Sequence, residues 1–186
     1  MMKCIPFNIR GLGDHSKFVS LRSFLLENGS IMVLVQETTS TADCIYAYFN
    51  TMFPTWHLVV VDAEGLSKGV AVMWDPNATK FSTYKFFAGI FLSGYIHGQR
   101  SWIHVINMYA PYCNHKTFWK RVIDFDILKV GMVVVAGDFN CTLSHEEGWG
   151  MYYRHDLLTN FISNIFYVHH LKDIKPRLCC PTWYNG

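Results

Sequence analysis

Asp138 and Asn140 directly follow an apolar run, and this arrangement suits chemistry better than any other in the chain. The run at residues 132–136 reads MVVVA and ends at Gly137, which is typical of a buried strand. Side chains two residues apart in a strand point to the same side. A carboxylate and a carboxamide would then meet at the mouth of a sheet, where α/β folds commonly place ligands. Because Gly, Asp and Asn are also ordinary turn residues, a polar turn is the alternative.

Three other segments share this design, an apolar strand that ends in polar residues. A further apolar strand falls between the second and the third of them. The three segments are residues 5–13 (IPFNIRGLG), 31–38 (IMVLVQET) and 102–111 (WIHVINMYAP), and the further strand is 69–74 (GVAVMW). Burying polar side chains is costly unless something uses them. The recurrence therefore favours a site over four unrelated turns.

In this order and at these separations, the four segments resemble the endonuclease/exonuclease/phosphatase superfamily. That superfamily includes DNase I, apurinic/apyrimidinic endonucleases, inositol polyphosphate 5-phosphatases and LINE retrotransposon endonucleases. The resemblance covers essentially the whole chain. Residues 8–13 (NIRGLG), 69–74 and 181–186 (PTWYNG) look most like the endonuclease domain of plant LINE elements. The fold that this implies is α/β, a DNase I-like four-layer sandwich of two stacked mixed β-sheets flanked by helices.

The resemblance also implies site residues for phosphodiester hydrolysis. Such hydrolysis needs a water in line and neutralised phosphoryl oxygens, and Mg²⁺, with its preference for carboxylate and water oxygens, suits this. Glu37 matches the metal-binding glutamate, with Asn8 beside it, and Mn²⁺ is a second candidate ion. Tyr109 matches the tyrosine whose hydroxyl meets the scissile phosphate. Asp138 matches the residue that orients or deprotonates the water, and Asn140 the amide that holds the phosphate in the transition state.

Each of these residues also has a purely structural interpretation. Glu37 could be a surface carboxylate at a strand end, Asn8 a turn-capping amide and Tyr109 a half-buried core tyrosine. Tyr112, just after the Tyr-Ala-Pro segment, stands where many members of the superfamily carry Asn. That difference puts one expected phosphate contact in doubt.

Two segments that the resemblance leads one to expect, Arg-x-Asp-Arg and Ser-Asp-His, are not found in the sequence. We therefore expect a C-terminally truncated domain that lacks its last strands. General acid–base groups contribute about 10²–10⁴-fold to such reactions, so a catalytically inactive remnant, inert or binding-only, is the alternative to a DNA endonuclease. A phosphatase acting on inositol phosphates or phospholipids is a third reading, disfavoured by the LINE-like ends at 8–13 and 182–186.

Composition sets wider bounds. A chain of 186 residues fits one domain, 1–186, and 51% of it is hydrophobic while only 16% is charged. The net charge of +2 is too weak to argue for nucleic acid and does not exclude it. DNA is thus a partner implied by the resemblance, and nothing indicates a protein partner or an oligomer. Candidate phosphate contacts are Arg10, Lys68, Arg100, Lys116, Lys120 and Arg121.

The cysteines and the apolar segments bear on location. The six cysteines form no CxxC pair or zinc signature, so we expect reduced thiols in a nuclear or cytoplasmic protein. No segment reaches the roughly 18 apolar residues of a membrane span. The first motif begins at Ile5, which leaves no room for a secretion signal. The expectation is a protein that is neither secreted nor membrane-spanning.

The elements that must position these residues follow from periodicity and turn signals. Strands and helices alternate at both ends of the chain and strands dominate its middle, a pattern that favours two stacked sheets with helices outside. Pro6 lacks an N–H and therefore suits an edge strand or a bulge. Expected strands are 2–9, 31–36, 56–62, 69–75, 79–87, 90–97, 101–109, 131–137, 167–172 and 181–184, and expected helices are 16–28, 41–52, 115–129 and 154–166.

Overall fold

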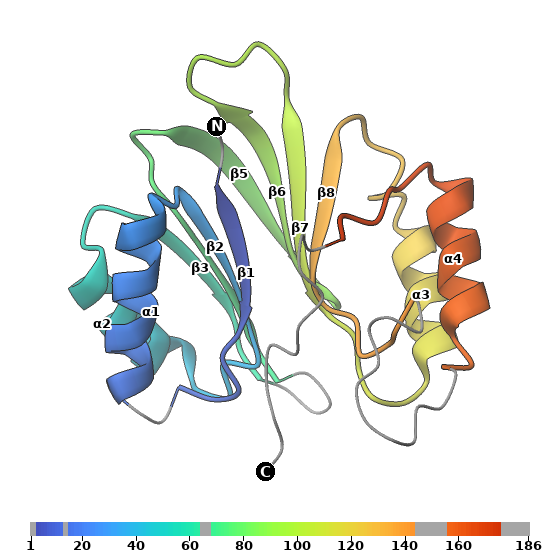
Figure 1. Ribbon diagram of the computed structural model, residues 1–186, viewed down its shortest axis with the longest axis horizontal. Helices are drawn as coiled ribbons and strands as arrows, with labels where there is room; N and C mark the ends of the chain where they lie inside the picture. The colour runs from blue at the N-terminus through green and yellow to red at the C-terminus, as the bar shows by residue number, and fades with distance from the viewer. Residues whose placement is uncertain (1–2, 13–14, 64–67, 144–155, 176–186) are drawn as a thin grey trace. The chain divides into compact units, whose positions relative to one another are not determined.

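The computed structural model describes residues 3–12, 15–63, 68–143 and 156–175. Within these residues there are eight strands and four helices (Figure 1). The strands are β1 (Cys4–Asn8), β2 (Met32–Gln36), β3 (His57–Val61), β4 (Val70–Trp74), β5 (Thr79–Phe86), β6 (Gly89–Ile96), β7 (Ile103–Tyr109) and β8 (Val133–Asp138). The helices are α1 (His15–Asn28), α2 (Ala42–Met52), α3 (His115–Asp124) and α4 (Thr159–Val168).

The chain divides into two compact units. The first consists of residues 1–112 and 130–139, and the second of residues 113–129 and 140–186. All eight strands, together with α1 and α2, belong to the first unit, whereas α3 and α4 belong to the second. The expectation of one domain over residues 1–186 stays a prediction.

The first unit contains two four-stranded sheets, ordered β1-β2-β4-β3 and β5-β6-β7-β8. Both sheets are mixed, as expected, and both have one parallel pair at an edge. In the first sheet β1 runs parallel to β2, and in the second β8 runs parallel to β7; the other neighbours are antiparallel. The carboxyl ends of these two parallel pairs carry the polar residues that the sequence singled out.

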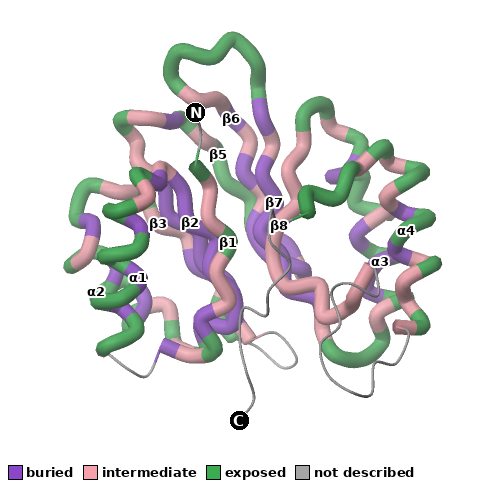
Figure 2. The backbone as a smooth tube through the Cα atoms, viewed as in Figure 1, coloured by how far each residue is buried: buried purple, intermediate pink, exposed green. Residues whose placement is uncertain are grey.

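Apolar side chains pack on both faces of the first sheet. One cluster lies between the two sheets, with Leu34 and Val72 meeting Ile90 and Val105. The other lies between the first sheet and the helices α1 and α2, which cover its outer face (Figure 1). β2 and β4 are therefore buried along their whole length (Figure 2). Buried on both faces, they read as continuous apolar runs rather than as alternating ones.

The edge strands behave differently from the central ones. β1 is an edge strand and its Pro6 is exposed, which confirms the expectation for this proline. β8 is also an edge strand, and all six of its residues are only half-buried. Met132, just before it, is 58% exposed. The run does form a strand, but the prediction that it is buried was wrong, because a β-branched run does not distinguish an edge strand from a central one.

Other corrections concern the second unit. The expected helix at 115–129 ends at Asp124, and the one expected at 154–166 spans Thr159–Val168 instead. The strand expected at 167–172 does not exist: residues 167–168 end α4 and residues 169–172 form a turn and an irregular segment. His169-His170 directly follow α4, whose buried residues are Ile162 and Ile165. The strand expected at 181–184 lies outside the described residues.

The structure also bears on the thiols and on membrane crossing. Cys4, Cys44, Cys113 and Cys141 are free thiols, and Cys179 and Cys180 lie outside the described residues. Burial raises the pKa of the Cys4 thiol to about 12, which keeps it protonated and unreactive at neutral pH. Among the described helices, none has both the length and the apolar character that crossing a membrane requires.

Candidate active site

The two parallel strand pairs end in matching positions. Asn8, the last residue of β1, pairs with Gln36 at the end of β2. Tyr109, the last residue of β7, pairs with Asp138 at the end of β8. The two sheets meet here through a hydrogen bond, since Asn8 Nδ2 donates to Asp138 Oδ2 at 2.6 Å. The stacked sheets thus bring together side chains 130 residues apart in the sequence.

Glu37 follows β2 directly and is only 5% exposed. Lys68 Nζ lies 3.2 Å from its Oε2, and the Tyr112 hydroxyl donates to its Oε1 at 3.4 Å. The ammonium also lies 4.9 Å from the centre of the Tyr112 ring. Burial lowers the pKa of Lys68, but the hydrogen bond to Glu37 and the charge of Glu37, aided by Tyr112, outweigh burial and raise that pKa above 10.5.

Tyr109 lies in the same neighbourhood. Its side chain is 4% exposed, and its ring meets the Tyr112 ring edge-on at 6.4 Å between centroids. Tyr109 is therefore buried rather than half-buried, and burial alone fits a core tyrosine as well as a site residue. Its place at the end of β7, opposite Asp138, puts it beside the other predicted residues.

The backbone at Glu37 is held in an unusual conformation. Its φ is +53°, and that of Thr39 is +47°; non-glycine residues there cost about 1–2 kcal/mol each. Hydrogen bonds on both sides fix the segment. The amides of Ile9, Gly11 and Leu12 donate to the carbonyls of residues 36, 37 and 38, and the amides of residues 38 and 39 donate to the carbonyls of residues 69 and 68. Such over-determined strain clusters at functional sites.

Two glycines make this close approach possible. A Cβ on Gly11 would lie 2.7 Å from Thr39 Oγ1, and a Cβ on Gly69 would collide with Thr38 Oγ1. Both glycines also have positive φ, +87° and +78°, which L side chains rarely adopt. The glycines of the NIRGLG and GVAVMW motifs therefore serve the segment that presents Glu37.

A buried amide pair supports the same segment from beneath. Gln36 Nε2 donates to Asn107 Oδ1 at 2.6 Å and to the Leu34 carbonyl at 2.9 Å. Asn107 Nδ2, from the other sheet, donates to the carbonyls of Val35 and Ala71 at 3.1 and 3.0 Å. Gln36 is 2% exposed and Asn107 fully buried. A buried network with these bonds satisfied fixes how the two sheets stack next to Glu37.

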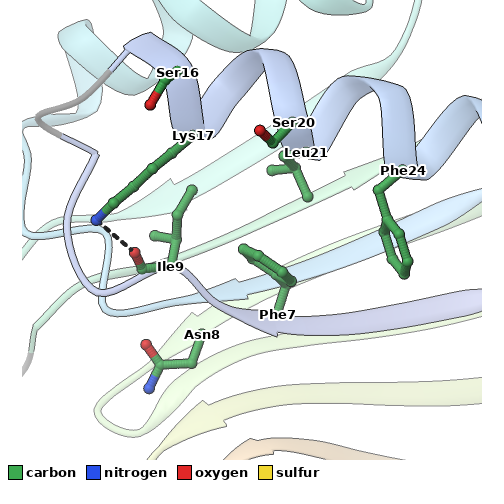
Figure 3. Close-up of a pocket in the computed structure, with 8 residues that line it drawn as sticks. All are labelled: Phe7, Asn8, Ile9, Ser16, Lys17, Ser20, Leu21 and Phe24. Atoms are coloured by element: carbon green, nitrogen blue, oxygen red, sulfur yellow. Dashed lines mark hydrogen bonds between the residues drawn. The ribbon is translucent and has the colours of Figure 1, made fainter. Parts of the chain in front are cut away.

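The loop after β1 is fixed by its own residues. Asn8 Oδ1 accepts from the Arg10 amide at 3.1 Å, so the turn-capping role is real and coexists with the bond to Asp138. Lys17 Nζ donates to the carbonyls of Ile9, Arg10 and Gly11 at 3.1–3.3 Å. Asn8 projects from the side of β1 opposite to Phe7 and Ile9, which face α1 (Figure 3). Between α1 and β1 lies a hollow of about 490 Å³, lined by four apolar residues and by four polar ones, Asn8, Ser16, Lys17 and Ser20.

Asn140 belongs to the second unit. Its φ is +46°, so the chain leaves the extended conformation after β8. The argument that Asp138 and Asn140 share one side of a strand was therefore wrong. Two residues further on, the Thr142 amide donates to Asp156 Oδ2 at 3.1 Å and its carbonyl accepts from Thr159 Oγ1 at 2.8 Å. These contacts shape the segment that follows Asn140.

The donor set suits one hydrated divalent cation. Among the described residues, no three His, Cys, Asp or Glu side chains group closely enough to hold a metal ion. Mg²⁺ usually keeps several waters and binds through one or two carboxylates plus a substrate phosphate. The Glu37 carboxylate and the Asn8 amide oxygen, which has a second lone pair, fit such an ion. The metal roles of Glu37 and Asn8 stay predictions.

Solved structures share this architecture. The endonuclease domain of TRAS1, a telomere-specific non-LTR retrotransposon, matches with a TM-score of 0.62 and 13% identity over 89% of this chain and 71% of its own. An endonuclease/exonuclease/phosphatase from Bacteroides vulgatus matches with a TM-score of 0.59 and 13% identity, over 74% of this chain and 65% of its own. An AP endonuclease from Archaeoglobus fulgidus matches with a TM-score of 0.59 and 20% identity, over 81% of this chain and 62% of its own.

The chain has the DNase I-like α/β fold of these solved structures. No family model matches the sequence, and neither does any curated protein. At identities of 13–20%, the likeness establishes the DNase I-like α/β fold alone. It confirms the fold expected from the motifs, and the roles of Asn8, Glu37, Tyr109, Asp138 and Asn140 stay predictions.

Several residues at this end of the two sheets were missed or misjudged from sequence. Lys68 was expected as a phosphate contact, yet its ammonium pairs with Glu37. Asn107 was only part of a motif, although an asparagine inside an apolar strand was a signal for a buried polar network. Lys17 gave no signal, since a lysine on a helix usually faces water.

Proposed function

We propose that this chain is a metal-dependent phosphodiesterase of endonuclease type that acts on DNA. The observation that carries the proposal is the meeting of Asn8 and Asp138 across the two sheets, with Tyr109 paired to Asp138 in the strand register. Glu37 is buried one residue beyond the same end of β2. These four side chains come from the ends of four different strands, β1, β2, β7 and β8.

In this proposal each residue has one task. Asp138, oriented by the Asn8 amide, positions and deprotonates the attacking water. Tyr109 donates its hydroxyl to a phosphoryl oxygen, and Asn140 donates its amide to the phosphate in the transition state. Glu37 and Asn8 would hold Mg²⁺, which neutralises charge on the phosphoryl group when bound. The water attacks phosphorus while the P–O bond to the leaving deoxyribose oxygen breaks.

The names of the structural neighbours support DNA as the substrate. One is the endonuclease domain of a retrotransposon and another an AP endonuclease. Nucleases and phosphodiesterases thus share this fold. The finer assignment, a LINE-type endonuclease, rests on the NIRGLG and PTWYNG motifs.

A specific observation favours a second candidate, a protein that binds without cleaving. The Glu37 carboxylate is already neutralised by Lys68 at 3.2 Å. A carboxylate that keeps this partner permanently would hold no metal, and the site would then be inert.

Nicking of supercoiled plasmid by the purified protein in Mg²⁺ separates the two. We expect nicking that EDTA abolishes and that Asp138→Ala lowers by at least about 100-fold, the scale of a lost general base. Asp43→Ala, which changes an exposed carboxylate in α2, is the matched control and should nick like the wild type. An absence of nicking by folded protein would establish the inert candidate.

A further inference from the structure

We propose that the Lys68 ammonium is the counter-cation of the Glu37 carboxylate when no divalent ion is bound, and that metal binding must displace it. This inference rests on the proposed metal-dependent function and deepens it. It assigns to Lys68 the control of metal affinity at this site.

The first step is the burial of Glu37. At 5% exposure, its carboxylate has lost most of its water, and a buried charge is costly unless it is paired. Its partners on the described residues are the Lys68 ammonium at Oε2 and the Tyr112 hydroxyl at Oε1. Of these two, only Lys68 carries a positive charge. A cation beside this carboxylate therefore stabilises it.

The second step is that the Lys68 side chain can leave while its backbone stays. The Lys68 carbonyl accepts from the Thr39 amide at 2.9 Å, and the next carbonyl, of Gly69, accepts from the Thr38 amide at 3.3 Å. These bonds anchor the residue to the segment that presents Glu37. The side chain itself is 40% exposed and ends in a flexible four-carbon stem, so rotation alone removes the ammonium.

The third step is that the displaced ammonium has somewhere to go. It already lies 4.9 Å from the centre of the Tyr112 ring, and an aromatic face attracts a cation. Lys68 can therefore release Oε2 and stay over Tyr112. A divalent ion and an ammonium at the same oxygen would repel each other, so the two cations exclude one another there.

The test is Mn²⁺ binding to the DNA-free protein, measured by electron paramagnetic resonance titration of free Mn²⁺. Removal of a hydrogen-bonded charged competitor, worth about 1.5 kcal/mol or more, should tighten binding about tenfold. We expect this gain in Lys68→Met and in Lys68→Gln, with Lys68→Arg staying near the wild type. Lys80→Met, which removes an exposed lysine from β5, should change nothing. Glu37→Gln should abolish the tight site in every background.

The outcomes separate the inference from the function on which it rests. Equal Mn²⁺ affinity in the wild type and both neutral variants, with loss in Glu37→Gln, would overturn the role of Lys68 and leave the metal site standing. Binding that ignores Glu37→Gln, or no binding in any folded variant, would overturn the metal site and the inference with it. Thermal unfolding of each variant confirms that folded protein is being titrated.

Discussion

Asn8 joins the two sheets through a single side chain. Its amide nitrogen donates to Asp138 Oδ2 at 2.6 Å, and its amide oxygen accepts from the Arg10 backbone at 3.1 Å. An aspartate at this position would keep the acceptor and lose the donor. The structure therefore explains why an amide rather than a carboxylate stands at the end of β1.

Asn8→Asp should lower the free energy of unfolding by about 1–3 kcal/mol at pH 7, because it removes a hydrogen bond to a charged group and places two carboxylates face to face. Asn8→Ala, without the repulsion, should cost less. Urea unfolding followed by circular dichroism measures both. Asn50→Asp, at an exposed amide in α2, is the control. An Asn8→Asp variant as stable as this control would contradict the geometry.

Lys68 and Glu37 show the limits of residue type as a guide. A lysine ahead of a strand and a glutamate after one are ordinary surface residues in a sequence. The burial of Glu37 makes the pair consequential, because an ammonium beside a dehydrated carboxylate competes with any ion that would bind there.

At the scale of elements, β7 is the strand that locks the sheets together. Its Asn107 reaches across to carbonyls on β2 and β4 and to the Gln36 side chain. The neighbouring residues on β2 and β4 are apolar and specify contact but not register. The hydrogen bonds of the Asn107 amide are directional, so they form only when the two sheets are stacked in one relative position.

Asn107→Leu should therefore lower the free energy of unfolding by about 2–4 kcal/mol, since it leaves buried polar groups without their partner. Gln36→Leu combined with Asn107→Leu should cost less than the sum of the single changes. Urea unfolding measures all three. Asn50→Leu, on an exposed helix position, should stay within about 0.5 kcal/mol of the wild type. Strict additivity of the two buried changes would argue against a shared network.

The strands were predicted within a residue or two where turns bound them. Asp75-Pro76-Asn77 separates β4 from β5, and His97-Gly98-Gln99 separates β6 from β7, as expected, since turn formation depends on adjacent residues. The prediction was wrong at residues 167–172 (YVHHLK), because so short a segment with a few apolar residues fits a strand or a helix end equally well.

At the scale of the whole molecule, the chain passes between the two units three times, after residues 112, 129 and 139. Neither unit is a continuous stretch. β8 reaches its place beside β7 only after the α3 segment of the other unit. This interleaving links the folding of each unit to that of the other.

We therefore predict one cooperative unfolding transition for the chain. Differential scanning calorimetry should give a calorimetric enthalpy equal to the van't Hoff enthalpy, and circular dichroism and tryptophan fluorescence should give coincident curves. Two resolved transitions would show instead that the units are separate domains. A scan repeated after cooling tests reversibility, without which the comparison of enthalpies has no meaning.

Most strands, their polar ends and the DNase I-like fold class could be predicted from the sequence alone. Period-two alternation, apolar runs and turn residues are local patterns, and each can be recognised from a short stretch of sequence. The tertiary structure alone decided which side chains meet. Asn8 reaches Asp138 across 130 residues, Gln36 reaches Asn107 across 71, and Lys68 reaches Glu37 across 31. These contacts depend on how two sheets stack and which carboxylate loses its water, and neither is encoded in any short stretch of the chain.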